Sequence, residues 1–280
     1  MKVVYCPQMQ APTQGYSPSA GKPALVMQAW QESWPDLQIR PAMPLSESDI
    51  CRGHDAAFVR NIFALRIPNG FGTRSAEVNA SLPYTNGAML TAARWALEDN
   101  TCVAAPVSGF HHAGWDSAED FCTFNGLMLT ALALQAETPG MKIGILDYDY
   151  HYGNGTADII SVLKVENIVN ITAGETFKDP EQASFFLTHI EDDLDALEGC
   201  AIVLYQAGAD PHIDDPLGGF LSTSQLFQRD SRVFQGLRRR GIPVAWNLAG
   251  GYQKPVSKVI GIHENTMRAA IEALRLFPSR

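Results

Sequence analysis

The sequence predicts an α/β protein in which helices cover both faces of a parallel β-sheet. Three observations support this fold class. Short β-rich runs alternate with longer helical segments, polar clusters follow several of the runs, and 280 residues with 46% hydrophobic content suffice for a large buried core. No internal repeat and no convincing linker interrupt the pattern, so we expect residues 1–280 to form a single domain.

The predicted elements follow in order along the chain. We expect strands at residues 3–6, 102–107, 142–147, 167–172, 201–206 and 243–248. We expect helices at residues 87–98, 126–135, 156–163, 180–197, 224–239 and 256–275. Residues 8–74 hold many of the prolines and several glycines, so we assign no regular element there and predict a loop at residues 67–74.

Composition argues against several classes of function. The formal net charge is −9 and there is no long basic run, which argues against binding to a nucleic-acid backbone. No apolar run is long enough to span a bilayer, and no signal peptide opens the sequence. The five cysteines are scattered and lack CxxC spacing, which argues against a disulfide framework. We therefore expect a cytoplasmic protein without a membrane partner.

The stretch at residues 143–156 is the most informative part of the chain. It places Asp147, Asp149 and His151 at alternate positions after an apolar run. On an extended strand, alternate residues share a face, so the three side chains could project to one side. Two carboxylates beside an imidazole are costly to bury without a positive charge, and this donor set suits zinc, iron or manganese.

Three further polar clusters also follow predicted strands. Residues 108–112 contain His111 and His112, residues 207–210 end in Asp210, and residues 249–252 end in Tyr252. Ligands of open parallel sheets bind outside the carboxyl ends of the strands. We therefore expect the four clusters to converge on one edge of the sheet and to form an active site.

Together these motifs resemble those of the zinc-dependent histone deacetylase family, which also includes the acetylpolyamine amidohydrolases. The matching pieces are GFHHA at 109–113, FCTFN at 121–125, DYDYHYGNGT at 147–156, AGADPHIDDPLG at 207–218 and GGY at 250–252. They look closest to the class IV branch and its bacterial relatives. The resemblance implies the arginase/deacetylase fold and one deacetylase-like catalytic domain.

The resemblance also implies roles for individual residues. One Zn²⁺ would be held by Asp149, His151 and Asp210, with Fe²⁺ as an alternative ion. His112 would be the general base on the attacking water, and His111 would be a second histidine that acts electrostatically or as an acid. Tyr252 would donate a hydrogen bond to the oxyanion. A structural K⁺ or Na⁺ would be bound by Asp147, with Thr172 as a further ligand.

The implied substrate is an acylated amine, either an acyl-lysine or an acetylpolyamine, in a channel lined by Phe121, Asp120, Leu217, Gly250 and Gly251. Two positions depart from the common family pattern. Asp120 stands where glycine is usual, which brings negative charge to the channel and favours a cationic substrate. Asn154 stands where parts of the family carry an aspartate that partners the general base.

Two other functions compete with deacylation. The ureohydrolases share the fold, but they bind two manganese ions and need further carboxylates; here His212 stands where a second aspartate would be expected. A non-catalytic acyl-lysine-binding paralogue is the second alternative, and loss of His112, Tyr252 or a ligand would indicate it. All of these residues are present.

Overall fold

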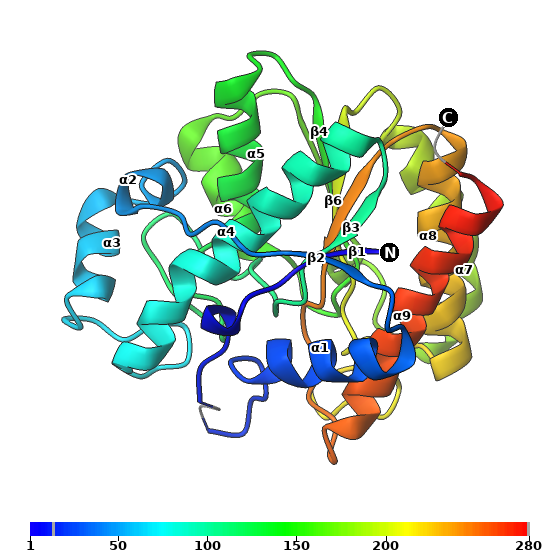
Figure 1. Cartoon of the computed structure of the whole chain (residues 1–280), viewed down its shortest axis with the longest axis horizontal. Coiled ribbons are helices and arrows are strands. Elements are labelled where there is room, and N and C mark those ends of the chain that lie inside the picture. Colours follow the sequence, from blue (N-terminus) through cyan, green and yellow to red (C-terminus); the bar gives the residue numbers. More distant parts are fainter. Residues whose placement is uncertain (13–14, 279–280) are drawn as a thin grey trace.

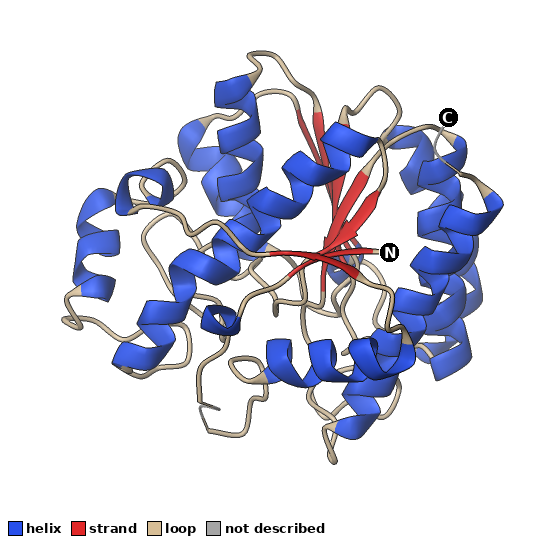
Figure 2. Ribbon diagram, in the orientation of Figure 1, coloured by secondary structure: helices blue, strands red, loops and turns tan. Residues whose placement is uncertain are grey.

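A seven-stranded parallel β-sheet forms the centre of the molecule, with helices on both sides (Figures 1 and 2). The structure, a computed structural model, describes residues 1–12 and 15–278. The strands are β1 (Lys2–Val4), β2 (Gln38–Arg40), β3 (Cys102–Ala104), β4 (Ile143–Asp147), β5 (Ile168–Thr172), β6 (Ile202–Gln206) and β7 (Val244–Asn247). Their order is β2-β1-β3-β7-β6-β4-β5, and all neighbouring pairs are parallel. The predicted fold class is confirmed, and each predicted strand overlaps an observed one.

The helices divide into two layers. They are α1 (Lys22–Ser33), α2 (Glu47–Ile50), α3 (Ala56–Phe63), α4 (Ala76–Asp99), α5 (Gly126–Glu137), α6 (Asn154–Leu163), α7 (Ala183–Ala196), α8 (Thr223–Arg239) and α9 (Ser257–Leu276). Short 3₁₀ turns lie at η1 (Pro7–Met9), η2 (Ala173–Glu175) and η3 (Pro180–Gln182). Helices α1, α7, α8 and α9 pack on one face of the sheet, and α2 to α6 pack on the other (Figure 1). Within the described ranges, none of the helices combines the length and apolar character needed to cross a bilayer.

Alternate residues of the strands belong to two separate hydrophobic cores, one on each face of the sheet. Val3 faces the core under α1 and α9, whereas its neighbour Val4 faces the core under α4. On β4, Leu146 faces the core under α1 and α9, and its neighbour Ile145 faces the core under α4. Because both faces are covered, these strands are apolar throughout, and their ends are the places where polar side chains can gather.

The segment 8–74 is more regular than the sequence indicated. It contains α1, β2, α2 and α3, while residues 67–74 form the predicted loop. Helix α1 buries Val26, Met27 and Trp30, a spacing that follows one helical face. The proline and glycine content of the segment concealed these short elements, which depend on tertiary packing more than on local propensity.

Helix α4 also begins earlier than predicted. Ser75 caps it by accepting from the Val78 amide, and the helix passes through Pro83 without ending. At Gly87 a Cβ would lie 1.9 Å from the carbonyl oxygen of Met43, so glycine lets the 43–44 segment cross the helix closely. Gly87 therefore allows another backbone segment to pass close to the helix, and it does not mark the start of the helix.

Candidate metal centre and catalytic residues

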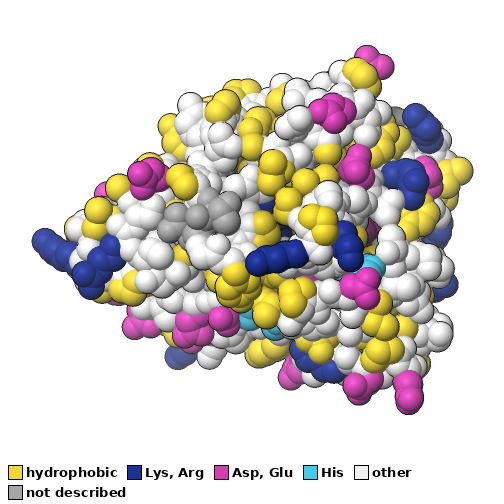
Figure 3. All heavy atoms as spheres, turned by 90° about the horizontal axis from the view of Figure 1, so that it is seen from below, with side chains coloured by type: hydrophobic (Ala, Val, Ile, Leu, Met, Phe, Trp, Pro, Cys, Tyr) yellow, Lys and Arg dark blue, Asp and Glu magenta, His cyan; other side chains and the backbone are white. Residues whose placement is uncertain are grey.

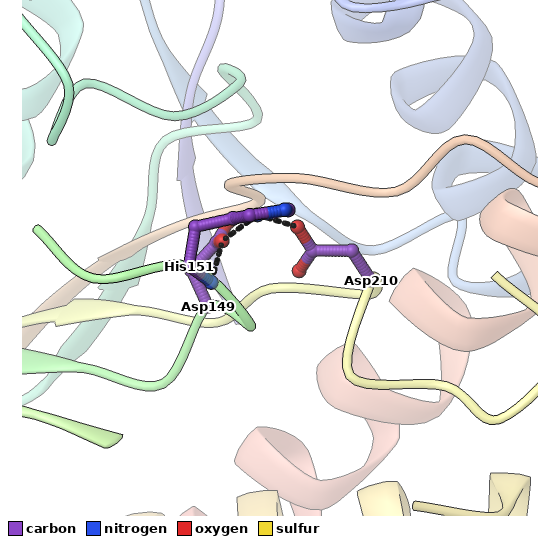
Figure 4. Close-up of side chains that lie close together, drawn as sticks. All are labelled: Asp149, His151 and Asp210. Atoms are coloured by element: carbon purple, nitrogen blue, oxygen red, sulfur yellow. Dashed lines mark hydrogen bonds and ion pairs between the residues drawn. The ribbon is translucent and has the colours of Figure 1, made fainter. Parts of the chain in front are cut away.

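Three side chains from two strand ends form a possible metal-binding group (Figure 4). Asp149 and His151 follow β4, and Asp210 follows β6. One potential ligand atom from each lies within 4.8 Å of the others. His151 Nδ1 is 3.1 Å from Asp149 Oδ1 and 3.2 Å from Asp210 Oδ2. Both carboxylates are buried, and the imidazole lies between them (Figure 4).

The path of the chain after β4 differs from the extended path that the sequence suggested. The strand ends at Asp147, and the next residues bend. The amide of Asp149 donates to Asp147 Oδ1 at 3.2 Å, and the amide of His151 donates to Asp149 Oδ1 at 2.9 Å. These local side-chain bonds turn the backbone. Asp147 lies outside the possible metal-binding group, although it and Asp149 both contact the ring of His111.

The electrostatics of this group favour a bound cation. Burial and the charge on Asp149 raise the pKa of Asp210 to about 7. Burial opposes protonation of His151, but its contacts with the two carboxylates raise its pKa to about 10. The carboxylates therefore attract positive charge strongly. Two carboxylate oxygens and one imidazole nitrogen, with no fourth protein ligand among the described residues, form a donor set that fits a catalytic divalent metal.

The two adjacent histidines have different environments. His111 is buried, and its Nδ1 lies 2.6 Å from Asp147 Oδ2. Burial opposes its protonation, but the charges of Asp147 and Asp149 raise its pKa to about 9. By contrast, burial and the neighbouring charge of His111 lower the pKa of His112. Of the two histidines, His111 therefore has the raised pKa and His112 the lowered one.

His112 is oriented by Asn154, one of the two residues that depart from the common family pattern. Its Nδ1 lies 2.6 Å from Asn154 Oδ1, at the start of α6. A carboxamide oxygen only accepts, so this contact places the proton on Nδ1 and leaves Nε2 free to accept another. The asparagine thus selects a tautomer suited to a base without adding a negative charge.

Tyr252 lies on a loop that buried polar residues hold in place. Its amide donates to Asp215 Oδ2 at 2.7 Å, and Asp215 Oδ1 accepts from the amide of Leu217 at 3.1 Å. Burial and the charge of Asp210 raise the pKa of the Tyr252 phenol, so it remains a hydrogen-bond donor across the neutral range. The loop before it includes Ala249, at φ +52°.

Lys22 supports the same loop from the N-terminal part of the chain. Its Nζ donates to the carbonyl oxygen of Ala249 at 2.7 Å, and the side chain is buried at the start of α1. Burial lowers its pKa to about 8, against the raising effect of Asp210 and Asp149. The sequence analysis did not identify this lysine, because only the fold reveals that it contacts a residue 227 positions away.

One small cavity connects most of the expected site residues. It is lined by Ser19, Ser108, Gly109, His111, His112, Asp120, Phe121, Cys122, Asp149, His151, Gly250 and Tyr252. Of the other expected residues, Leu217 contributes its carbonyl oxygen, 3.2 Å from His151 Nε2, while Gly251 packs against Ala209 and Val259 at φ +141°. Thr172 pairs with Asp147 across β4 and β5, so it lies beside the expected monovalent-cation ligand.

A tight turn presents Phe121 to this cavity. The amides and carbonyls of Glu119 and Cys122 bond reciprocally, at 3.0 and 2.7 Å. The two residues between them, Asp120 and Phe121, have φ values of +43° and +68°. This is the geometry of a type I′ turn, which favours Asn-Gly or Asp-Gly. A phenylalanine in the second position costs about 1 kcal/mol, and the turn retains it with the ring on the cavity wall.

Comparison with known proteins gives consistent matches. The family model described as "Histone deacetylase domain" matches residues 19–165. An uncharacterised protein from Picosynechococcus is 29% identical over 212 residues, covering 69% of both chains. Histone deacetylase 2 of Arabidopsis thaliana is 27% identical, and a histone deacetylase-like amidohydrolase of Pseudomonas aeruginosa is 30% identical; the chain spans 50% and 34% of their lengths.

Two solved structures share the fold along nearly the whole chain. The HDA15 HD domain superposes with a TM-score of 0.78 at 17% identity, covering 100% of this chain and 97% of that one. An acetylpolyamine aminohydrolase from Burkholderia pseudomallei superposes with a TM-score of 0.74 at 15% identity, covering 96% and 98%. At these sequence identities, the similarity shows a shared fold and no more.

Proposed function

Because this chain belongs to the histone deacetylase domain family, we propose that it is a metal-dependent deacylase that hydrolyses an N-acyl amine to a free amine and a carboxylate. Family membership and the arginase/deacetylase fold support deacetylase-type amide hydrolysis. The observation that supports the mechanism best is the position of Asp149, His151, His112 and Tyr252 around one cavity. We propose an acetyl group as the acyl group and one Zn²⁺ as the metal, with Fe²⁺ as the alternative.

The proposed roles follow from the contacts of each side chain. A divalent ion held by Asp149, His151 and Asp210 would polarise the acyl carbonyl and lower the pKa of the attacking water. His112 accepts the water proton at Nε2, since its Nδ1–H is held by Asn154. The Tyr252 hydroxyl donates to the oxygen on which negative charge develops.

The departing amine needs a proton, and His111 is suited to stabilise or supply it. Asp147 orients the His111 ring, and its charge raises the pKa of the imidazole. The other oxygen of Asp147 accepts from Gln206 Nε2 at 3.0 Å, so the carboxylate is held on both sides. We also propose a structural K⁺ or Na⁺ near Asp147 and Thr172, one catalytic domain over residues 1–280, and a cytoplasmic location.

The two-metal alternative receives less support from the geometry. Among the described residues, Asp149, His151 and Asp210 form the only group suited to a metal. His212, two positions after Asp210, contacts Thr223 Oγ1 through Nε2 at 2.8 Å. A second manganese ion would need further carboxylate ligands, and both oxygens of the neighbouring Asp215 already accept from the amides of Tyr252 and Leu217.

The test is carboxylate release from acetyl-lysine peptides, long-chain acyl-lysine peptides and acetylpolyamines, using protein of measured metal content, with and without a hydroxamate. We expect one metal per chain and hydroxamate-sensitive turnover, and we expect Asp210→Ala to lose the metal. A full complement of metal without turnover of any amide would support the binding-only alternative. Two manganese ions with guanidino hydrolysis would support a ureohydrolase.

A further inference from the structure

Asp120 contributes a free carboxylate to the mouth of the cavity. It lines the same cavity as His112, His151 and Tyr252, yet the residue is exposed to solvent. Within the described part of the chain, its carboxylate makes no hydrogen bond or ion pair, and neither lysine nor arginine lines the cavity. The carboxylate of Asp120 therefore has no lysine or arginine partner within the cavity lining.

The turn itself does not require a carboxylate. At the first central position of a type I′ turn, asparagine or glycine serves as well as aspartate. The side chain of Asp120 is therefore available for a ligand, whereas the adjacent Glu119 is exposed and lies outside the cavity lining. This difference between two neighbouring acids provides a matched pair for experiment.

Aromatic rings surround the same entrance. Tyr16, from the loop before α1, meets Phe121 edge-on with ring centroids 5.6 Å apart and lies 6.4 Å from the ring of Tyr252. The ring of Phe71 lies 5.7 Å from that of Phe121. Tyr16 is 52% exposed, so about half of its surface remains open to solvent beside Phe121. Aromatic faces attract alkylammonium groups, most strongly when an anion lies nearby.

We propose that Asp120, together with Tyr16 and Phe121, binds a second ammonium group on the amine portion of the substrate. This rests on the proposed function and specifies its substrate class: an N-acylated amine that carries a further positive charge a few carbons from the amide. The acyl carbonyl reaches the metal ligands while the charged end of the amine remains at the mouth, beside Asp120. Acyl-lysine within a neutral peptide lacks such a group.

The test uses two hydroxamates of equal chain length, one ending in ammonium and one in hydroxyl. Their Kd values are measured by calorimetry on the metal-loaded wild type, Asp120→Asn and Glu119→Gln. Asp120→Asn preserves the turn and removes the charge, while Glu119→Gln removes a neighbouring charge outside the cavity. We expect the wild type and Glu119→Gln to favour the ammonium ligand about fivefold, and Asp120→Asn to lose this preference. The preference should also decrease as salt is added.

A parallel kinetic assay separates this inference from the proposed function. It compares kcat/KM for a mono-acetylated straight-chain diamine and for the matching acetylated amino alcohol. Equal binding of the two hydroxamates by the wild type, or a preference that survives in Asp120→Asn, would overturn the ammonium site even if both amides are hydrolysed. A charge-dependent preference in binding without hydrolysis would support the ammonium site and contradict the catalytic proposal.

Discussion

Substituting Gly250 with alanine should disable metal binding through a single added methyl group. A Cβ at this position would lie 2.1 Å from Asp210 Oδ2 and 2.8 Å from Asp149 Oδ2. The Gly250 backbone does not have a positive φ, so alanine can adopt its conformation. The perturbation is therefore steric, and it is directed at two of the proposed metal ligands.

The expected size of the effect follows from these distances. Ordinary contact begins at 3.4 Å, so Asp210 must retreat by about 1.3 Å, the difference between 3.4 and 2.1 Å. Metal–ligand distances tolerate only about 0.2 Å. Changes outside the ligand set already cost about 10–100-fold in metal affinity, so displacement of a ligand should cost at least about 100-fold. Overpacking should also destabilise the fold by about 1–3 kcal/mol.

The assay is metal occupancy across a series of chelator-buffered zinc concentrations, with the melting temperature measured on the same samples. Gly261→Ala is the matched control, because a Cβ there meets nothing within 4 Å and the residue lies in α9. This control should retain the metal and gain up to about 1 kcal/mol of stability. Wild-type zinc affinity in a folded Gly250→Ala protein would refute the proposed ligand geometry.

Three other substitutions test different parts of the site and fold. Tyr252→Phe should retain the metal and lose about 10²–10³ in kcat, since it removes the oxyanion donor; near wild-type turnover would contradict that role. Asp215→Asn should lower kcat about tenfold with unchanged metal content, because asparagine keeps only one acceptor oxygen for the amides of Tyr252 and Leu217; an unchanged kcat would show that Asp215 does not position the loop. Burial lowers the pKa of His54 from 6.5 to about 4, so the unfolded chain binds a proton before the folded one, and about 3 kcal/mol of stability should be lost as the pH falls through that interval. Urea unfolding at several pH values should show that the free energy of unfolding falls less with pH in His54→Gln than in the wild type. An identical pH dependence of the two proteins would exclude His54 as the cause of the acid destabilisation.

Much of the site could be predicted because the relevant residues follow strands directly. In a parallel sheet, the carboxyl ends of neighbouring strands meet, so His111, Asp149, Asp210 and Tyr252 converge once the strands are identified. Strand alternation, however, could not predict the path of the chain after β4. The strand ends at Asp147, and the Asx-type bonds that turn the next residues depend on local geometry that the residue pattern does not encode.

The N-terminal contributions could not be predicted. Lys22 and Tyr16 contact Ala249 and Tyr252, which lie more than two hundred positions later in the sequence. No local motif marks either residue, and the surrounding prolines and glycines concealed α1. Their roles depend on how residues 15–22 pack against the loop that carries Ala249 and Tyr252, which is a property of the completed tertiary structure.

The strand order has a consequence for how the site is assembled during synthesis. Strand β7 is the last to be made, yet it occupies the middle of the sheet between β3 and β6. Until it is inserted, β2-β1-β3 and β6-β4-β5 are two separate ribbons, with the histidine pair following one and the metal ligands following the other. Because β7 follows both ribbons in the sequence, it must be synthesised before it can pair with β3 and β6 and join the strands that carry the two halves of the site.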